Sequence, residues 1–332
     1  MSLQARTGFN MWDMRRIRRI DLEITSFCNI KCSGCSRETT VFREDFKDKE
    51  IMSLETIQQK FRKEDWPGLK IVNFCGSVDE PTTHPQFFDI IKFFKEWDVF
   101  ISISTNGSIR SEKWWTELAE ILKDHQHNVI WGIDGIDETS EIYRKGSKFV
   151  KVQKNFRAFN KAGGKSAWQF IVFEHNKHQL PFLEDIAKKE GFVKTTIINS
   201  ARGDGADPKI QPVRFITKET PEIECRYLNE GLIFINHLGD VIPCCYWNSD
   251  QLSLSSPNYV IKDIPQHRYS RMWRDHGGPL ATNLKYNEIK DVVEGDFFQS
   301  IVESWSDGSP ILNRCEHFCK KKNQSIIVRK KI

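Results

Sequence analysis

Short β-rich runs alternate with amphipathic helical segments through the first two-thirds of the chain. The apolar pattern predicts strands at 20–25, 70–74, 99–104, 129–133, 167–173 and 195–199. Between them it predicts helices at 53–62, with Ser53 as N-cap, and at 87–96, 111–123, 150–162 and 180–190. Strands joined by crossover helices run parallel. Six such units predict an α/β fold with a partial (β/α)6 TIM-like barrel, since a full barrel needs eight.

The pattern changes after residue 200. Residues 201–212 (ARGDGADPKIQP) are rich in Gly, Pro and charge, as linkers are, and 231–242 predict a β-hairpin that turns at 238–240. Beyond the hairpin we expect irregular structure, apart from a helix at 297–305. These changes predict a basic N-terminal extension at 1–19, a barrel at 20–204 and a smaller C-terminal domain, hairpin plus helix, at 205–332.

Composition narrows the class of protein. Apolar residues make up 39% and charged residues 28% of the 332, so a packed core is expected. No run approaches the roughly 20 apolar residues of a membrane span, and the basic start lacks the apolar core of a secretory signal. We therefore expect a cytoplasmic protein. The basic clusters at 15–19, 320–322 and 329–331 are typical of solvated surface, although they leave a nucleic-acid partner open.

Of the nine cysteines, all but Cys75 fall in two groups, one at 28–35 and one at 225–319. Disulfides are rare in the cytoplasm, so this grouping indicates metal ligation. Cys28, Cys32 and Cys35 form a C-x3-C-x2-C run directly after the first predicted strand. Thiolates are the natural ligands of iron–sulfur clusters. The alternative is a zinc site, but structural zinc usually takes four ligands, and no fourth lies nearby in the sequence.

This run and several later segments resemble the radical S-adenosylmethionine (SAM) superfamily. Residues 74–85 (FCGSVDEPTTHP) are similar to its Gly-Gly-Glu-Pro turn, with Asp79 where glycine is usual. Residues 103–107 (ISTNG) are similar to its ribose-lining strand end, and 132–135 (GIDG) and 143–147 (YRKGS) follow in the family's order. Gly34 stands where an aromatic residue is frequent, so Phe27 or backbone groups are expected to contact adenine.

The resemblance implies a set of cofactors and contacts. Cys28, Cys32 and Cys35 would hold a [4Fe–4S] cluster whose open iron binds the methionine part of SAM and cleaves it to a 5′-deoxyadenosyl radical. Glu80 would accept the methionine amino group, and Arg144 would pair with its carboxylate. Ser104 and Asn106 would face the ribose, and Asp134 would line the same site.

A second cysteine group resembles the superfamily's SPASM/twitch extension. Cys225 and Cys244 flank the predicted hairpin, and Cys315 and Cys319 form a closing pair. These four would ligate one auxiliary [4Fe–4S] cluster, with Cys245 as a substitute ligand. Ligand type alone leaves structural zinc open here.

The expected reaction removes a hydrogen atom from a small-molecule or sugar- or nucleotide-like substrate, and the auxiliary cluster accepts an electron. A reductase, flavodoxin or ferredoxin would supply the electron for SAM cleavage. The alternatives are a SPASM enzyme that modifies ribosomal peptides and a non-catalytic protein stapled by metal. The sequence identifies no catalytic acid or base and no membrane partner.

Overall fold

A nine-stranded sheet in the order β10-β9-β1-β3-β4-β5-β6-β7-β13 is the centre of the protein. The computed structural model describes residues 12–42, 50–199, 219–256, 258–261, 267–305, 312–322 and 329–331. From β9 to β7 the neighbouring strands pair in parallel, and β10 and β13 add antiparallel edges. The strands of this sheet are β1 (Arg19–Leu22), β3 (Ile71–Phe74), β4 (Phe100–Thr105), β5 (His127–Gly132), β6 (Ser166–Val172), β7 (Lys194–Asn199), β9 (Leu232–Ile235), β10 (Val241–Ile242) and β13 (Arg329–Lys331).

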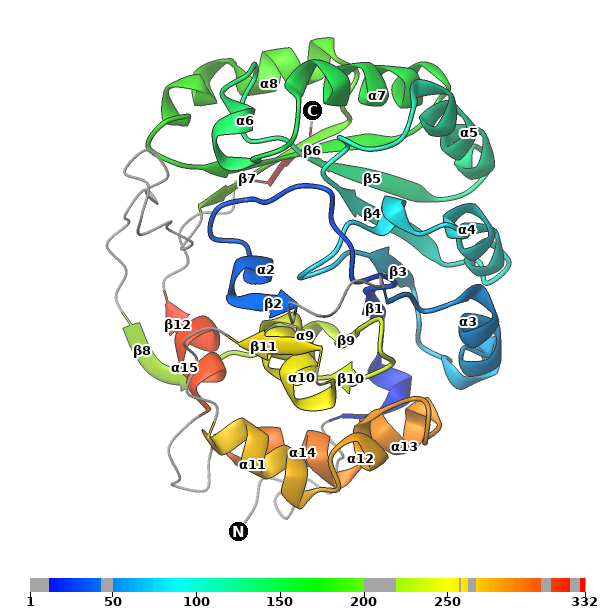
Figure 1. Cartoon of the computed structure of the whole chain (residues 1–332), viewed down its shortest axis with the longest axis vertical. Coiled ribbons are helices and arrows are strands. Elements are labelled where there is room, and N and C mark those ends of the chain that lie inside the picture. Colours follow the sequence, from blue (N-terminus) through cyan, green and yellow to red (C-terminus); the bar gives the residue numbers. More distant parts are fainter. Residues whose placement is uncertain are drawn as a thin grey trace.

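The helices that follow the parallel strands cover the convex side of this sheet (Figure 1). They are α3 (Leu54–Lys60), α4 (Phe87–Lys95), α5 (Glu112–Leu122), α7 (Phe149–Lys161) and α8 (Leu180–Lys189), with the short α6 (Ser140–Tyr143) before α7. Ser53 caps α3 by accepting a hydrogen bond from the backbone N–H of Thr56, as expected. The partial (β/α)6 barrel predicted from the sequence is therefore confirmed.

The two faces of the sheet differ in chemistry. On the convex face, Phe74 of β3 contacts Phe87 and Phe94 of α4, and Trp131 of β5 contacts Trp115 of α5. Side chains alternate between faces along a strand, so the residues next to Phe74 and Trp131 point to the concave side. The apolar core thus fixes which polar side chains face the inside of the barrel.

The predicted hairpin is present and joins the barrel sheet. Its strands β9 and β10 are antiparallel, and β9 pairs in parallel with β1, in the register Arg19 to Leu232. The division into domains stays a prediction. At the other end of the described chain, Trp12, Met14 and Ile17 precede β1 and are buried in the common core.

The expectation of irregular structure after the hairpin is wrong. The structure has the predicted helix as α14 (Asp296–Glu303), and also α10 (Asn248–Ser255), α11 (His267–Asp275), α12 (Pro279–Thr282), α13 (Ile289–Val293) and α15 (Asn313–Cys319). Several are only one or two turns long, too short for a helical period to show. In α10 the buried residues include Asn248 and Asp250, so tertiary hydrogen bonds replace the usual apolar stripe.

The remaining elements are short. Strands β2 (Thr40–Phe42) and β11 (Tyr259–Ile261) form one two-stranded sheet, and β8 (Glu219–Ile223) and β12 (Lys320–Lys322) form another. The other helices are α2 (Ser36–Thr39), α9 (Arg226–Glu230) and the 3-10 turns η1 (Met14–Arg16), η2 (Lys63–Asp65), η3 (Pro81–Thr83), η4 (Lys177–Gln179) and η5 (Cys245–Trp247). The predicted linker at 201–212 lies outside the described residues.

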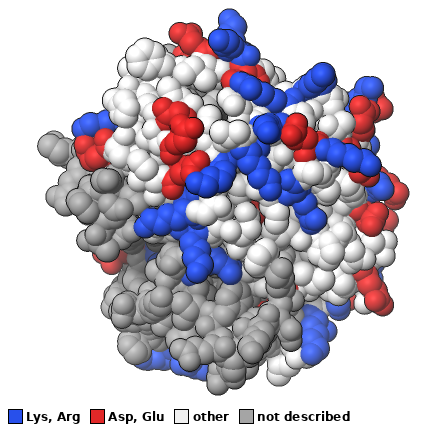
Figure 2. Space-filling view, turned by 45° about the horizontal axis from the view of Figure 1, so that its top comes forward, with Lys and Arg blue, Asp and Glu red and all other residues white. Residues whose placement is uncertain are grey.

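Two surface properties bear on partners. In the described part of the chain, no helix combines the length and the apolarity that a bilayer crossing requires. Figure 2 shows one face on which Lys and Arg side chains lie beside Asp and Glu. Mixed charge of this kind is typical of a solvated surface and differs from the single-sign field of a nucleic-acid groove.

We predict that Phe74→Ala lowers the free energy of unfolding by about 3–5 kcal/mol, because it removes a fully buried ring and leaves a cavity against α4. Val150→Ala, at a side chain that is 52% exposed on the same layer of helices, should change it by less than about 0.5 kcal/mol. Thermal or denaturant unfolding measures both. Equal losses for the two variants would contradict the assigned core.

Candidate functional site

The loop of the first cysteine group lies on the concave side of the barrel. It follows β1 and arches toward β6 and β7 (Figure 1). Backbone hydrogen bonds tie it to the segment after β5: the N–H of Lys31 donates to the carbonyl of Lys145 (2.8 Å), and that of Ser33 donates to Tyr143 (3.3 Å). Gly34 has φ of 70°, in the left-handed region that favours glycine. This turn explains why an aromatic residue is absent there.

Cys28 receives a hydrogen bond from the end of β4. The side-chain amide Nδ2 of Asn106 donates to Cys28 Sγ (3.7 Å) and to Asn29 Oδ1 (3.1 Å). The orientation of the Asn106 side-chain amide is fixed, because its Oδ1 accepts hydrogen bonds from the N–H (2.8 Å) and the hydroxyl (2.6 Å) of Ser108. Burial, reinforced by the nearby Glu80 carboxylate, raises the pKa of the Cys28 thiol to about 12. A bound metal would offset that cost, since thiolates are the ligating form.

Glu80 is buried and braces the turn after β3 against β4. Its carboxylate accepts from the hydroxyls of Thr82 (2.6 Å) and Thr105 (2.7 Å) and from the N–H of Asn106 (2.7 Å). Burial raises the pKa of Glu80, and these hydrogen bonds oppose the rise. Its own N–H donates to the carbonyl of Phe27 (2.8 Å), one residue before the first cysteine. Glu80 thus lies beside the cysteine loop, and its contact with SAM stays a prediction.

Asp134 and Arg144 form a buried ion pair, with Arg144 Nε 2.8 Å from Asp134 Oδ2. The Arg144 guanidinium lies against Gly132, where an added Cβ would come within 2.5 Å of it. Burial works against the charge, but Asp134 and the nearby Cys32 raise the pKa of Arg144. The sequence predicted a methionine carboxylate as the partner of this arginine. A guanidinium has five N–H donors, so pairing with Asp134 leaves capacity for a second carboxylate.

Two further residues of the predicted site can be placed. Ser104 lies in β4, two positions before Asn106, and is half-buried. Asp79, which replaces the usual glycine, packs its carboxylate against Gly76, and both its oxygens are buried without a hydrogen-bond partner. Burial first, and the neighbouring Glu23 and Glu80 second, raise the pKa of Asp79 well above its usual value.

The second cysteine group also comes together. Cys225 is the N-cap of α9, which leads directly into β9, so it lies on the side of the sheet where β1 and β9 begin. A hydrogen bond with Cys319 lowers the pKa of Cys225 to about 7 and raises that of Cys319, whose pKa the nearby Cys244 and Cys315 also raise. The four predicted auxiliary ligands are thus neighbours.

Cys245 has a different environment from Cys244. It interacts with the hydroxyl of Tyr227, which donates to Asp21 Oδ2 of β1 (3.1 Å), and it lies near Cys75. Among the described side chains, no three His, Cys, Asp or Glu converge closely enough to ligate one ion. In a four-iron cluster each thiolate binds a separate iron, so its ligands do not converge on one point.

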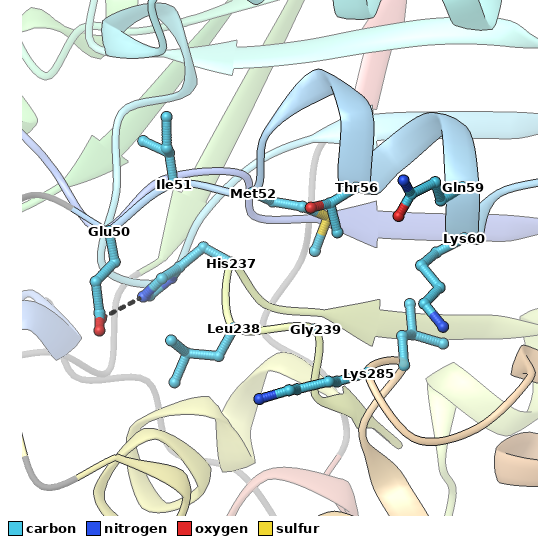
Figure 3. A pocket seen from close by; sticks show the side chains of 11 residues that line it. Glu50, Ile51, Met52, Thr56, Gln59, Lys60, His237, Leu238, Gly239 and Lys285 are labelled. Carbon is cyan, nitrogen blue, oxygen red and sulfur yellow. Dashed lines mark ion pairs between the residues drawn. The ribbon is translucent and has the colours of Figure 1, made fainter.

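A Glu–His–Glu chain, in which Glu23 and His237 are buried, connects β1 to the hairpin and was not revealed by the sequence. His237 Nδ1 lies 3.1 Å from Glu23 Oε1, and His237 Nε2 lies 3.4 Å from Glu50 Oε2. Glu23 also accepts from the N–H groups of Ser77 (2.8 Å) and Val78 (3.1 Å) in the turn after β3. Figure 3 shows Glu50 and His237 at one end of a cavity of about 670 Å³ between α3 and the hairpin turn. No sequence motif indicates this chain, because Glu23, Glu50 and His237 are far apart in the sequence.

The histidine chain predicts a pH dependence of stability. Burial disfavours the His237 cation, but Glu23 and Glu50 outweigh burial and raise its pKa above the usual 6.5. A raised pKa contributes stability that is present below about pH 6.5 and is lost as the pH rises through the folded-state value. We expect the melting temperature of the wild type to fall over that range, and His237→Gln to melt lower and to lack this part of the slope. Parallel slopes from about pH 6 to 9 would contradict the ion pairing.

Comparison with known proteins finds a family model that matches the segment carrying this site. Residues 22–179 match the model of the Radical SAM superfamily. They contain the first cysteine group and every predicted SAM-contacting residue. The cofactor-modifying protein of the tungsten-containing aldehyde ferredoxin oxidoreductase of Pyrococcus furiosus is 35% identical over 103 residues, which cover 31% of this chain and 28% of that protein.

A probable GTP 3′,8-cyclase of Thermococcus kodakarensis is 25% identical over 171 residues, covering 48% of this chain and 53% of that enzyme. The chain therefore spans about half or less of the length of these curated relatives. The crystal structure of Streptococcus suis SuiB bound to its precursor peptide SuiA has a TM-score of 0.59 at 14% identity, over 87% of this chain and 67% of that one. At that identity the similarity shows the fold.

Proposed function

From the match of residues 22–179 to the model of the Radical SAM superfamily, we propose that this chain is an enzyme that reductively cleaves SAM. Cys28, Cys32 and Cys35 would hold the [4Fe–4S] cluster. When bound, such a cluster supplies the electron that releases a 5′-deoxyadenosyl radical, which removes a hydrogen atom from substrate.

The observation that carries this proposal is the convergence of the predicted SAM contacts on the cysteine loop. Asn106 donates a hydrogen bond to Cys28, and the Arg144 cation interacts electrostatically with Cys32. The backbone N–H of Glu80 donates to the carbonyl of Phe27, the residue before Cys28. These residues come from the ends of β3 and β4 and from the loop after β5, on the side of the barrel where parallel strands end. Ligand sites of such barrels are built from these loops. Ser104 and Asp134 lie on the same strand ends.

A second [4Fe–4S] cluster, held by Cys225, Cys244, Cys315 and Cys319, is the other part of the proposal. The pairing of Cys225 with Cys319 and the nearness of Cys244 and Cys315 support this ligand set. The contact of Cys245 with Tyr227 favours Cys244 over Cys245 as the ligand. This cluster would accept the electron left on the substrate radical and so make the reaction a net oxidation.

We propose a small-molecule, sugar- or nucleotide-like substrate. The polar register partners Asp21, Asn73, Ser102 and Asn128 on β1, β3, β4 and β5 support this class. A peptide substrate is the alternative, because SuiB, whose fold is similar, was crystallised with its precursor peptide. A reductase, flavodoxin or ferredoxin would be the electron donor. A non-catalytic scaffold held together by metal would not need the buried polar residues Glu80, Asn106 and Arg144 beside the first cysteine loop.

We predict that replacing Cys28, Cys32 and Cys35 together with Ala halves the iron content of anaerobically reconstituted protein, from about eight to about four irons per chain. Only the first cluster should be lost, because the auxiliary ligands lie on other elements. Iron and sulfide analysis measures the result. Retention of about eight irons would remove these cysteines from the site, and a wild type with bound zinc would favour the scaffold.

We predict that Asn106→Leu lowers the reduction potential of the first cluster, because the variant loses the N–H donor to Cys28 Sγ. A hydrogen bond to a ligand sulfur favours the reduced, more negative cluster. We expect the reduction equilibrium to fall about tenfold, ~59 mV for one electron, in an EPR-monitored titration without SAM.

Asn155→Leu is the matched control. Asn155 is an equally buried amide in the same region, but its Nδ2 donates to the carbonyl of Gly107 (2.8 Å) and not to sulfur. We expect it to leave the potential unchanged. The same shift in both variants would show that the potential responds to packing rather than to this hydrogen bond.

A further inference from the structure

Four polar side chains form a row across the concave wall of the barrel. Asp21, Asn73, Ser102 and Asn128 are register partners on the neighbouring strands β1, β3, β4 and β5. Register partners point to the same face of the sheet. Phe74 and Trp131 lie on the opposite face, which packs on the helices. Barrel interiors are usually filled by bulky branched apolar side chains. A polar row at this level is therefore an exception that needs a physical reason.

Hydrogen bonding within the protein explains one half of the row. Asp21 accepts from Arg19 Nε (2.6 Å), Asn73 Nδ2 (2.8 Å) and the Tyr227 hydroxyl (3.1 Å), so its charge is paired and its oxygens are used. Asn73 Nδ2 also donates to Cys75 Sγ (2.8 Å). This pattern fixes the Asn73 amide with its nitrogen toward Asp21 and its oxygen away from it.

Two oxygen acceptors of the row have no hydrogen-bond partner. Asn73 is 2% exposed, and its Oδ1 has no hydrogen-bond partner. The Oδ1 of Asn128, two strands away, is also buried and without a partner. An unpartnered buried acceptor costs about 1–3 kcal/mol. These two unpartnered acceptors lie on β3 and β5, the strands on either side of β4 with Ser102. Their arrangement indicates that they accept hydrogen bonds from a ligand.

We infer that this row binds the hydroxyl-bearing part of a neutral substrate, a sugar or the ribose of a nucleoside, through Asn73 Oδ1, Ser102 and Asn128 Oδ1. The inference rests on the proposed function and names its substrate class. Amide oxygens accept hydrogen bonds from hydroxyl groups. The single charge of the row is already paired, so the row offers a charged ligand no counter-ion. The backbones of β3 and β5 are about 10 Å apart, which suits a ring with hydroxyls on opposite sides.

The row lies between the two cysteine groups, a position that suits a substrate. The first cysteine loop follows β1, and Cys225 precedes β9, the parallel neighbour of β1. Asp21, in the middle of β1, joins the row to Tyr227, two residues after Cys225. A ligand on this wall would lie between the side of the barrel where the radical forms and the side with the auxiliary cysteines.

Saturation-transfer NMR on the oxidised, reconstituted protein tests the inference without any radical chemistry. The probes are D-glucose, uridine and a blocked triglycine peptide. We expect transfer to glucose or uridine in the wild type, and at least fivefold less in Asn128→Leu and in Ser102→Val. Transfer to glucose identifies a free sugar, and transfer only to the ribose protons of uridine identifies a nucleoside.

Thr195→Val is the matched control. The Thr195 hydroxyl is also buried and unpartnered, but Thr195 is the register partner of Trp168, which packs on the helix side. This variant should retain the wild-type transfer. The inference is overturned by transfer to neither hydroxylated probe, by equal transfer in Asn128→Leu and Ser102→Val, or by transfer to the peptide alone. Failure of SAM cleavage would instead count against the proposed function, which this experiment does not measure.

Discussion

The parallel pairing of β1 with β3 on one side and β9 on the other determines where the chemistry of this protein lies. In that register Asp21 stands opposite both Asn73 and Phe234. The first cysteine loop must then leave where β1 ends, and Cys225 must lie near where β9 begins. If the pairing register of β1 shifted by one residue, every side chain of β1 would point to the opposite face of the sheet. Such a shift would place Asp21 among the helices, where burial of an unpaired carboxylate is costly.

The same pairing couples the C-terminal part of the chain to the barrel. Tyr227 reaches Asp21, His237 reaches Glu23, and Asn248 donates to Glu23 (3.0 Å). These contacts bury charged and polar groups that are satisfied only when both parts are present. The buried polar groups therefore hold the second cysteine group in a fixed position relative to β1, as the proposed auxiliary cluster would require.

The sequence predicted the barrel well because its elements depend on local information. The strand and helix periods in 20–199 are strong. The C-x3-C-x2-C run is recognised from the spacing of its cysteines alone. The Glu23–His237–Glu50 chain and the row from Asp21 to Asn128 could not be predicted, since they depend on register between strands far apart in sequence. The partner of Arg144 was likewise hidden, because Asp134 is ten positions away. The short helices of the C-terminal region form through tertiary burial, which no local period records.

We propose that the loop from Cys28 to Cys35 supports reductive cleavage of SAM. The most direct measurement is anaerobic reconstitution with iron and sulfide, followed by dithionite reduction with SAM and chromatography for 5′-deoxyadenosine and methionine. We expect both products in equal amounts from the wild type and neither from the protein with all three cysteines replaced. Absence of 5′-deoxyadenosine from wild-type protein with its full iron content, with or without the hydroxylated probes, would contradict SAM cleavage at this loop.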